Sequence, residues 1–191
     1  IELPCSENTT VGIALSASLF GCYPILCFQR VEFVLLALEQ LFNNASTVRY
    51  LSRDELSFPV LFRFVIGRGW GQGPSHSQSL DSLLIQIPRI NLYLPVFPED
   101  STYIFSSVKE AVLPVISLEH RWIHYSENSG INVSSAAPYP IYLGSAITVI
   151  ASSYNVLLCM RLWRVYQSFD INIELINLFN PTSNDLSCIV D

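Results

Sequence analysis

Short apolar runs alternate along the chain with longer segments in which apolar residues recur at helical spacing. An apolar run of about four to eight residues is typical of a buried strand, whereas a helix needs a longer stretch. Strands that alternate with helices predict an α/β fold with a doubly wound, mostly parallel sheet covered by helices on both faces. The expected strands are 23–28, 59–66, 90–94, 112–118, 146–151 and 172–176.

Helical patterns fill the intervals between these strands. The first helix is expected from Glu7 to Phe20, because Ser6 is a favourable N-cap residue and Gly21 is a common helix stop. The segment 31–44 is apolar on nearly every side, which predicts a helix buried in the core or under a second subunit. Further helices are expected at 80–87, 100–110 and 154–169.

The segment 126–140 contains most of the turn-forming residues in the second half of the chain and is typical of a linker. It predicts a first domain at 1–125 and the start of a second domain at 141–191. The second domain offers two expected strands and one helix, which is too little to close a core. We therefore expect it to be completed by a partner or by further chain.

Residues 66–80 read IGRGWGQGPSHSQSL, with glycine at every second position from 67 to 73. Glycine lets the main chain approach a ligand closely, and ligands bind at the carboxyl ends of strands in open α/β sheets. The segment therefore predicts a ligand site with His76 at its end. A dinucleotide fingerprint would need glycine instead of Gln72, and a phosphate-binding P-loop would need a Gly-Lys-Ser/Thr sequence; neither is present.

The composition limits the classes of partner. Charged residues make up 14% of the 191 residues, against about 25% in ordinary soluble domains, so much of the surface is expected to be covered. The only lysine is Lys109 and the net charge is −6, which does not favour nucleic-acid binding.

The cysteines and the long uncharged stretches indicate neither a metal site nor a membrane span. The five cysteines lack metal-ligand spacing and are expected to be reduced, mostly buried thiols of an intracellular protein. Serine, glycine and proline interrupt the uncharged stretches 8–29 and 131–160, which argues against spans of about 20 apolar residues. No basic region followed by a cleavage site opens the sequence, so secretion is not indicated. The cysteines are Cys5, Cys22, Cys27, Cys159 and Cys188.

Residues 4–10, PCSENTT, followed by VGIA, and the segment 66–80 resemble the β subunit of thiamine-diphosphate-dependent 2-oxo acid dehydrogenases. Further matches are LEQLFN at 38–43, the residues 95–100 and LEHRW at 118–122. The similarity covers nearly the whole chain. It implies a transketolase-like pyrimidine-binding domain followed by part of a transketolase-type C-terminal domain.

The resemblance assigns roles to three residues. Glu7 matches the catalytic glutamate that hydrogen-bonds the aminopyrimidine of thiamine diphosphate, and Phe33 matches the aromatic residue that packs on that ring. His76 matches the histidine that faces the substrate and the lipoyl group, where a side chain titrating near neutral pH can assist proton transfer. Without the resemblance, Glu7 could simply complement a helix dipole, and Phe33 could be a core residue.

The motif that holds magnesium and the diphosphate in this superfamily, Gly-Asp-Gly…Asn, does not occur in the sequence. In the family it lies on the α subunit, so no metal ligand is expected here. The resemblance implies an α2β2 heterotetramer that binds thiamine diphosphate and Mg²⁺ between subunits. It would decarboxylate a 2-oxo acid oxidatively and pass the acyl group to the lipoyl domain of a dihydrolipoyl acyltransferase.

Two other functions fit the same sequence features. A split transketolase-like ketol transferase would share the domain and Glu7, and a diverged subunit could have only a structural role. Departures from the family pattern occur at Cys27, Arg89 and 109–114. The expected compartment is a bacterial cytoplasm, with a mitochondrial or plastid matrix as the alternative.

One further cluster of titratable residues follows the strand expected at 112–118. It consists of Glu119, His120 and His124. We expect these residues to lie at a solvated or interface edge.

Overall fold

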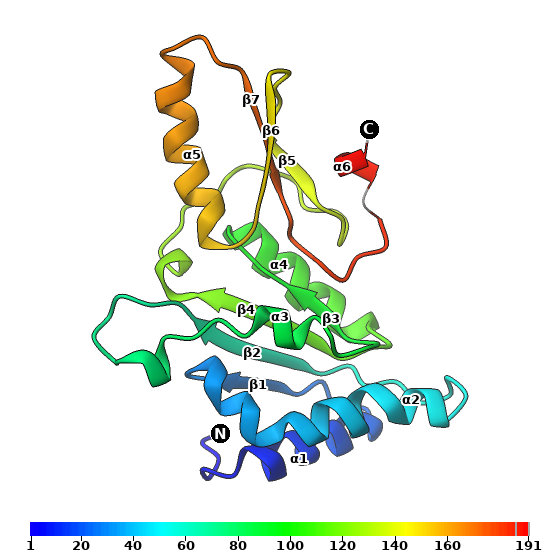
Figure 1. The fold of residues 1–191 in the computed structure, drawn as a ribbon. Coiled ribbons are helices and arrows are strands. Elements are labelled where there is room, and N and C mark those ends of the chain that lie inside the picture. Colours follow the sequence, from blue (N-terminus) through cyan, green and yellow to red (C-terminus); the bar gives the residue numbers. More distant parts are fainter. Residues whose placement is uncertain (186, 191) are drawn as a thin grey trace.

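The computed structural model describes residues 1–185 and 187–190, which form two β-sheets with helices packed against them (Figure 1). The first sheet has four strands in the order β1-β2-β4-β3, and all neighbouring strands run parallel. Its strands are β1 (Ile25–Phe28), β2 (Leu61–Ile66), β3 (Asn91–Tyr93) and β4 (Val115–His120). The expectation of a mostly parallel α/β sheet is confirmed.

The strand order places the carboxyl ends of β1, β2 and β4 side by side. After β2 the chain passes to the edge strand β3, and it then returns to β4 between them. The direction of winding therefore reverses between β2 and β4, which is where ligands bind in open α/β sheets.

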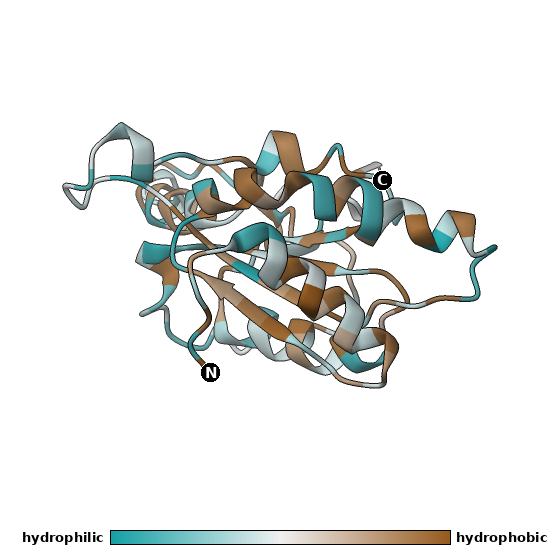
Figure 2. Cartoon of the chain, turned by 90° about the horizontal axis from the view of Figure 1, so that it is seen from below, coloured by the Kyte–Doolittle hydropathy of each residue, from teal (hydrophilic) through white to brown (hydrophobic). Residues whose placement is uncertain are grey.

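The lower face of this sheet in Figure 1 is covered by α1 and by a continuous helical run that follows β1. Figure 2 shows both from below, with apolar and polar positions mixed along each. Phe62, Phe64 and Ile66 of β2 belong to the main buried core beneath the sheet, together with Val11 of α1 and Val34 of the helical run. The helical elements are α1 (Glu7–Leu19), η1 (Val31–Ala37), η2 (Gln40–Thr47), α2 (Val48–Leu51) and α3 (Asp81–Leu84).

The upper face carries α4 (Pro98–Ser107), whose first turn is capped by Asp100. One oxygen of Asp100 accepts the backbone N–H groups of Val96 and Phe97 at 2.7 and 3.0 Å. The other accepts the hydroxyl of Tyr139 at 2.6 Å. Burial raises the pKa of Asp100 above its usual range, and these hydrogen bonds oppose that rise. The network ties α4 to the second sheet.

The second sheet has the order β5-β7-β6, with β5 antiparallel and β6 parallel to β7. Gly144 lies so close to the backbone of Ile173 and Glu174 that a side chain there would overlap it. Phe179 accepts a backbone hydrogen bond from Leu94 at 2.8 Å, which joins this sheet to the end of β3. The remaining elements are β5 (Tyr139–Tyr142), β6 (Ile147–Ala151), β7 (Ile173–Asn177), η4 (Val108–Glu110), η5 (Arg121–Ile123), α5 (Tyr154–Gln167) and α6 (Ser187–Val190).

Several sequence expectations need correction. The second half contains three strands rather than two, because β5 begins inside the segment 126–140 that we expected to be a linker. The helix expected at 31–44 is a 3-10 helix followed by a π-helix. Leu36 in that helix is 62% exposed, so burial within this chain does not explain its apolar surface. The domain boundary near Tyr125 stays a prediction.

The cysteines also differ from expectation. Cys5, Cys22 and Cys27 are exposed rather than buried, and Cys159 is half-buried. For Cys27 the apolar sequence neighbours misled the prediction, because β1 is an edge strand of the sheet. All four are free thiols, while the side chain of Cys188 lies outside the described part of the chain. None of the described helices is long and apolar enough to cross a membrane.

Candidate functional site

Phe33 and His76 meet at the carboxyl ends of β1 and β2. Phe33 lies in η1, which begins three residues after β1 ends, and His76 ends η3 (Pro74–His76) in the segment that follows β2. Their ring centroids are 5.7 Å apart at an interplanar angle of 51°. Both side chains are half-buried. The structure thus brings together two of the three residues that the sequence singled out.

Glu32 fixes the His76 segment to the helix that carries Phe33. Its Oε1 accepts the backbone N–H of Gln78 at 2.7 Å. Its other oxygen is buried and has no hydrogen-bond partner among the described residues, and the same is true of His76 Nδ1. Buried polar atoms are normally paired in folded proteins, so two unpaired atoms in this region are consistent with a ligand site.

Glu7 is the first residue of α1 and is half-buried. Its carboxylate makes no hydrogen bond or ion pair with the described residues, although its backbone oxygen accepts the hydroxyl of Thr10 at 3.0 Å. Helix α1 packs against η1, so Glu7 stands on the element beside Phe33. The hydrogen bonds and ring contacts of the described residues do not join Glu7 to Phe33 or His76.

The glycines of the loop before η3 adopt positive φ angles. Gly67 has φ of 119° and Gly69 has φ of 88°, conformations that favour glycine. A Cβ atom on Gly67 would lie 2.8 Å from Nε2 of His120. We expected these glycines to let a ligand approach the main chain. At Gly67 the side chain that comes close to the main chain is instead that of His120. The loop and η3 project from the body at the left of Figures 1 and 2.

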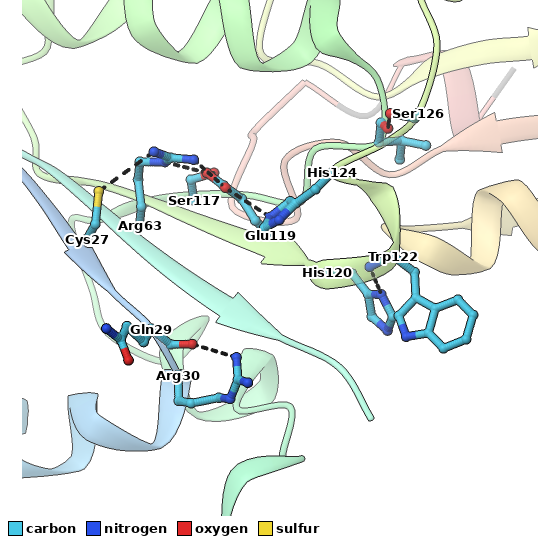
Figure 3. A network of polar contacts seen from close by, with 11 residues as sticks. Cys27, Gln29, Arg30, Arg63, Ser117, Glu119, His120, Trp122, His124 and Ser126 are labelled. Carbon is cyan, nitrogen blue, oxygen red and sulfur yellow. Dashed lines mark hydrogen bonds and ion pairs between the residues drawn. The ribbon is translucent and has the colours of Figure 1, made fainter. Parts of the chain in front are cut away.

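A second polar cluster joins β2 to β4 on the side of α4 (Figure 3). Glu119 accepts hydrogen bonds from Nε and Nη2 of Arg63 at 2.7 and 2.6 Å, and its Oε1 accepts the hydroxyl of Ser117 at 3.1 Å. His124 Nε2 lies 3.5 Å from Glu119 Oε2. The bond to Glu119 raises the pKa of Arg63, while burial opposes that effect. Nη1 of Arg63 contacts the thiol of Cys27 at 3.7 Å.

We expected Glu119, His120 and His124 to lie at a solvated or interface edge; a solvated position is wrong for Glu119, and His120 is half-buried. Glu119 is 7% exposed, and the His120 ring stacks on Tyr154 with centroids 4.7 Å apart. Burial lowers the pKa of His120, and the nearby charges of His124 and Arg68 lower it further. Only His124 is exposed.

A cavity of about 340 Å³ opens beside this cluster, at the point where the winding of the sheet reverses. It is lined by Arg63, Glu119, His124, Ser101 and Phe97, among others. Arg63 was not among the residues singled out from the sequence, although a single charged residue in the otherwise apolar run LFRFVI needs a partner when it is partly buried. Within the described residues, no group of three His, Cys, Asp or Glu side chains could hold a metal ion.

The comparisons with known proteins agree with the resemblance seen in the sequence. No family model matches the chain. The pyruvate dehydrogenase E1 component subunit beta of Rickettsia bellii is 26% identical over 197 aligned residues, covering 100% of this chain and 60% of that protein. The mitochondrial counterpart of Bos taurus is 27% identical, covering 99% and 55%. The acetoin:2,6-dichlorophenolindophenol oxidoreductase subunit beta of Cupriavidus necator is 24% identical, covering 100% and 58%.

Solved structures of transketolases share the fold. A transketolase of Pichia stipitis has a TM-score of 0.76 at 16% identity, covering 96% of this chain and 27% of that one. A split-gene transketolase described as an inactive β4 tetramer has a TM-score of 0.69 at 17% identity, covering 91% and 55%. The chain spans 60% or less of the length of the pyruvate dehydrogenase and acetoin oxidoreductase β subunits named above. The chain is similar in sequence to the β subunits of pyruvate dehydrogenase and other 2-oxo acid dehydrogenases, and it shares the fold of the transketolases.

Proposed function

We propose that the chain is the β-type subunit of a thiamine-diphosphate-dependent 2-oxo acid dehydrogenase component. It would take part in the oxidative decarboxylation of a 2-oxo acid and the transfer of the acyl group to a lipoyl group. The observation that carries the proposal is the contact of Phe33 with His76 at the carboxyl ends of β1 and β2, in a chain related to such subunits along its whole length.

The residues of this site fit the pyrimidine half of thiamine diphosphate. Phe33 offers a half-buried ring face for stacking, the carboxylate of Glu7 has no competing hydrogen bond, and Nδ1 of His76 has no partner among the described residues. When bound, the cofactor supplies the carbon nucleophile and the electron sink for decarboxylation.

The side chains of this chain would then bind, orient and move protons. Glu7 would hold a proton at its carboxylate, and Phe33 would pack on the cofactor ring and keep water from its face. His76 carries ring nitrogens that can give or take a proton, which suits it to assist the reacting substrate. Glu32 holds the His76 segment in place through the N–H of Gln78.

The other half of the site would come from an α-type subunit. The described residues provide no cluster for a metal ion, so the proposal assigns the Mg²⁺ and the diphosphate to that partner. The expected assembly is an α2β2 heterotetramer that is served by a lipoyl domain. The similar split-gene transketolase is named as an inactive β4 tetramer, which supports the expectation that this β-type chain is inactive alone. The proposed compartment is a bacterial cytoplasm, although relatives carry both bacterial and mitochondrial names.

The test is turnover of 2-oxo acids by the complex of this chain with its α-type subunit. Glu7→Gln keeps the shape of the side chain but removes its acid–base capacity, so turnover should fall by ~10²–10⁴-fold. Glu55→Gln, which changes an exposed carboxylate at a distant loop, is the matched control and should leave turnover unchanged. Normal turnover by the Glu7 variant would refute the proposal, and turnover of sugar phosphates alone would indicate a ketol transferase.

A further inference from the structure

Three of the few basic residues in this acidic chain gather around the glycine loop. The chain has ten Lys and Arg residues and a net charge of −6. Arg30 follows β1, Arg68 follows β2 and Arg121 follows β4, so all three extend from neighbouring parallel strands at the same edge of the sheet. None of the three forms a salt bridge with a carboxylate of the described residues.

Two of these cations lie near the indole ring of Trp70. The guanidinium carbon of Arg30 lies 4.6 Å from the centroid of the Trp70 ring, and that of Arg121 lies 5.5 Å from it. Arg30 is further oriented by a hydrogen bond from Nε to Gln72 Oε1 at 2.6 Å. Its Nη1 also donates to the Gln29 carbonyl at 2.7 Å (Figure 3). These contacts fix the position of a positive charge rather than neutralise it.

Arg63, in the same sheet, is an arginine with a structural role and differs from Arg30 and Arg121 in having a counter-charge. Its guanidinium makes two hydrogen bonds to the buried carboxylate of Glu119. Arg30 and Arg121 have no such counter-charge, and two cations on one ring repel each other unless an anion lies near both. The backbone N–H groups of 69–73 also donate no hydrogen bond within the described residues, which adds uncommitted donors to the same place.

The cluster adjoins the candidate catalytic segment, because Trp70 Nε1 donates a hydrogen bond to the carbonyl of His76 at 3.4 Å. We propose that Arg30, Trp70 and Arg121 form a binding site for an anionic group, the carboxylate or phosphate of a small molecule, beside His76. The proposed function assigns Glu7, Phe33 and His76 but no arginine, so this site is an addition to it. A guanidinium suits both kinds of anion, because its planar donors match their oxygens.

The test is titration of the chain at low ionic strength with inorganic phosphate and, separately, with acetate, followed by tryptophan fluorescence. Sodium chloride at equal ionic strength is the reference. Wild type should give a saturable change with phosphate or acetate, and Arg30→Gln or Arg121→Gln should each raise the Kd at least about fivefold. Arg164→Gln, which removes an exposed positive charge from α5, is the matched control and should bind like wild type.

Arg121→Lys separates loss of charge from loss of the planar donors, since it keeps the cation and should weaken binding less than Arg121→Gln does. Saturation by phosphate alone would assign the site to phosphorylated ligands, and saturation by acetate would assign it to carboxylates. The proposal is overturned if chloride produces the same change, or if Arg30→Gln and Arg121→Gln bind like wild type. Neither result would affect the proposed function, because this assay contains no thiamine diphosphate and measures no turnover.

Discussion

The ion pair between Arg63 and Glu119 is expected to be the most stabilising polar contact between β2 and β4. The Glu119 side chain is 9% exposed and the Arg63 side chain is 34% exposed. Breaking a buried ion pair by removing one partner costs about 3–5 kcal/mol. Because solvent reaches a third of Arg63, we expect Glu119→Gln to lower the free energy of unfolding by about 2–3 kcal/mol.

The assay is urea unfolding at neutral pH, followed by circular dichroism. Asp54→Asn is the matched control, because the Asp54 carboxylate, whose side chain is 55% exposed, pairs with Arg89 and Arg49 at the surface. Such exposed pairs contribute at most about 1 kcal/mol. The double variant Arg63→Met with Glu119→Leu should recover most of the loss, since no charge is left unpaired. The reasoning is refuted if Glu119→Gln costs no more than Asp54→Asn.

Three further outcomes follow from contacts near the two sheets. Because burial lowers the pKa of His120, the free energy of unfolding should decrease as the pH falls below about 6.5 towards that lowered pKa, and His120→Gln should remove this part of the pH profile. Gly67→Ala should destabilise the chain by about 2 kcal/mol or more in urea unfolding, and Gly71→Ala by only about 1 kcal/mol, because an added Cβ would meet neighbouring atoms within 4 Å at Gly67 but not at Gly71. Tyr139→Phe should cost about 1–3 kcal/mol by leaving the buried carboxylate of α4 without its hydroxyl donor, whereas Tyr142→Phe in the same strand should be nearly neutral in thermal unfolding.

The strands of the first sheet could be predicted because each is a short apolar run between turn residues. β5 could not, because Pro140 lies in it and the preceding residues have the composition of a linker. The exposure of Cys27 depends on β1 being the edge strand, and strand order is a property of the whole fold. Apolar neighbours in sequence therefore indicate a strand but not which of its faces is open.

In the candidate site, too, some residues could be predicted from the sequence and others depend on the fold. The glycine loop and His76 could be singled out from residue types alone, whereas Phe33 and Glu7 became candidates only through the family resemblance. The contact of Phe33 with His76 requires β1 and β2 to be parallel neighbours. The arginines at the carboxyl edge are too far apart in sequence to form a motif, and only strand order brings them together.

The most direct test of the account is calorimetric binding of thiamine diphosphate with Mg²⁺, measured on this chain alone and after co-expression with an α-type subunit from the same genome. The account predicts binding by the pair and none by the chain alone, with weaker binding when the pair carries Phe33→Ala. If the assembled pair fails to bind the cofactor, the chain is a structural subunit and the proposed catalytic role is wrong.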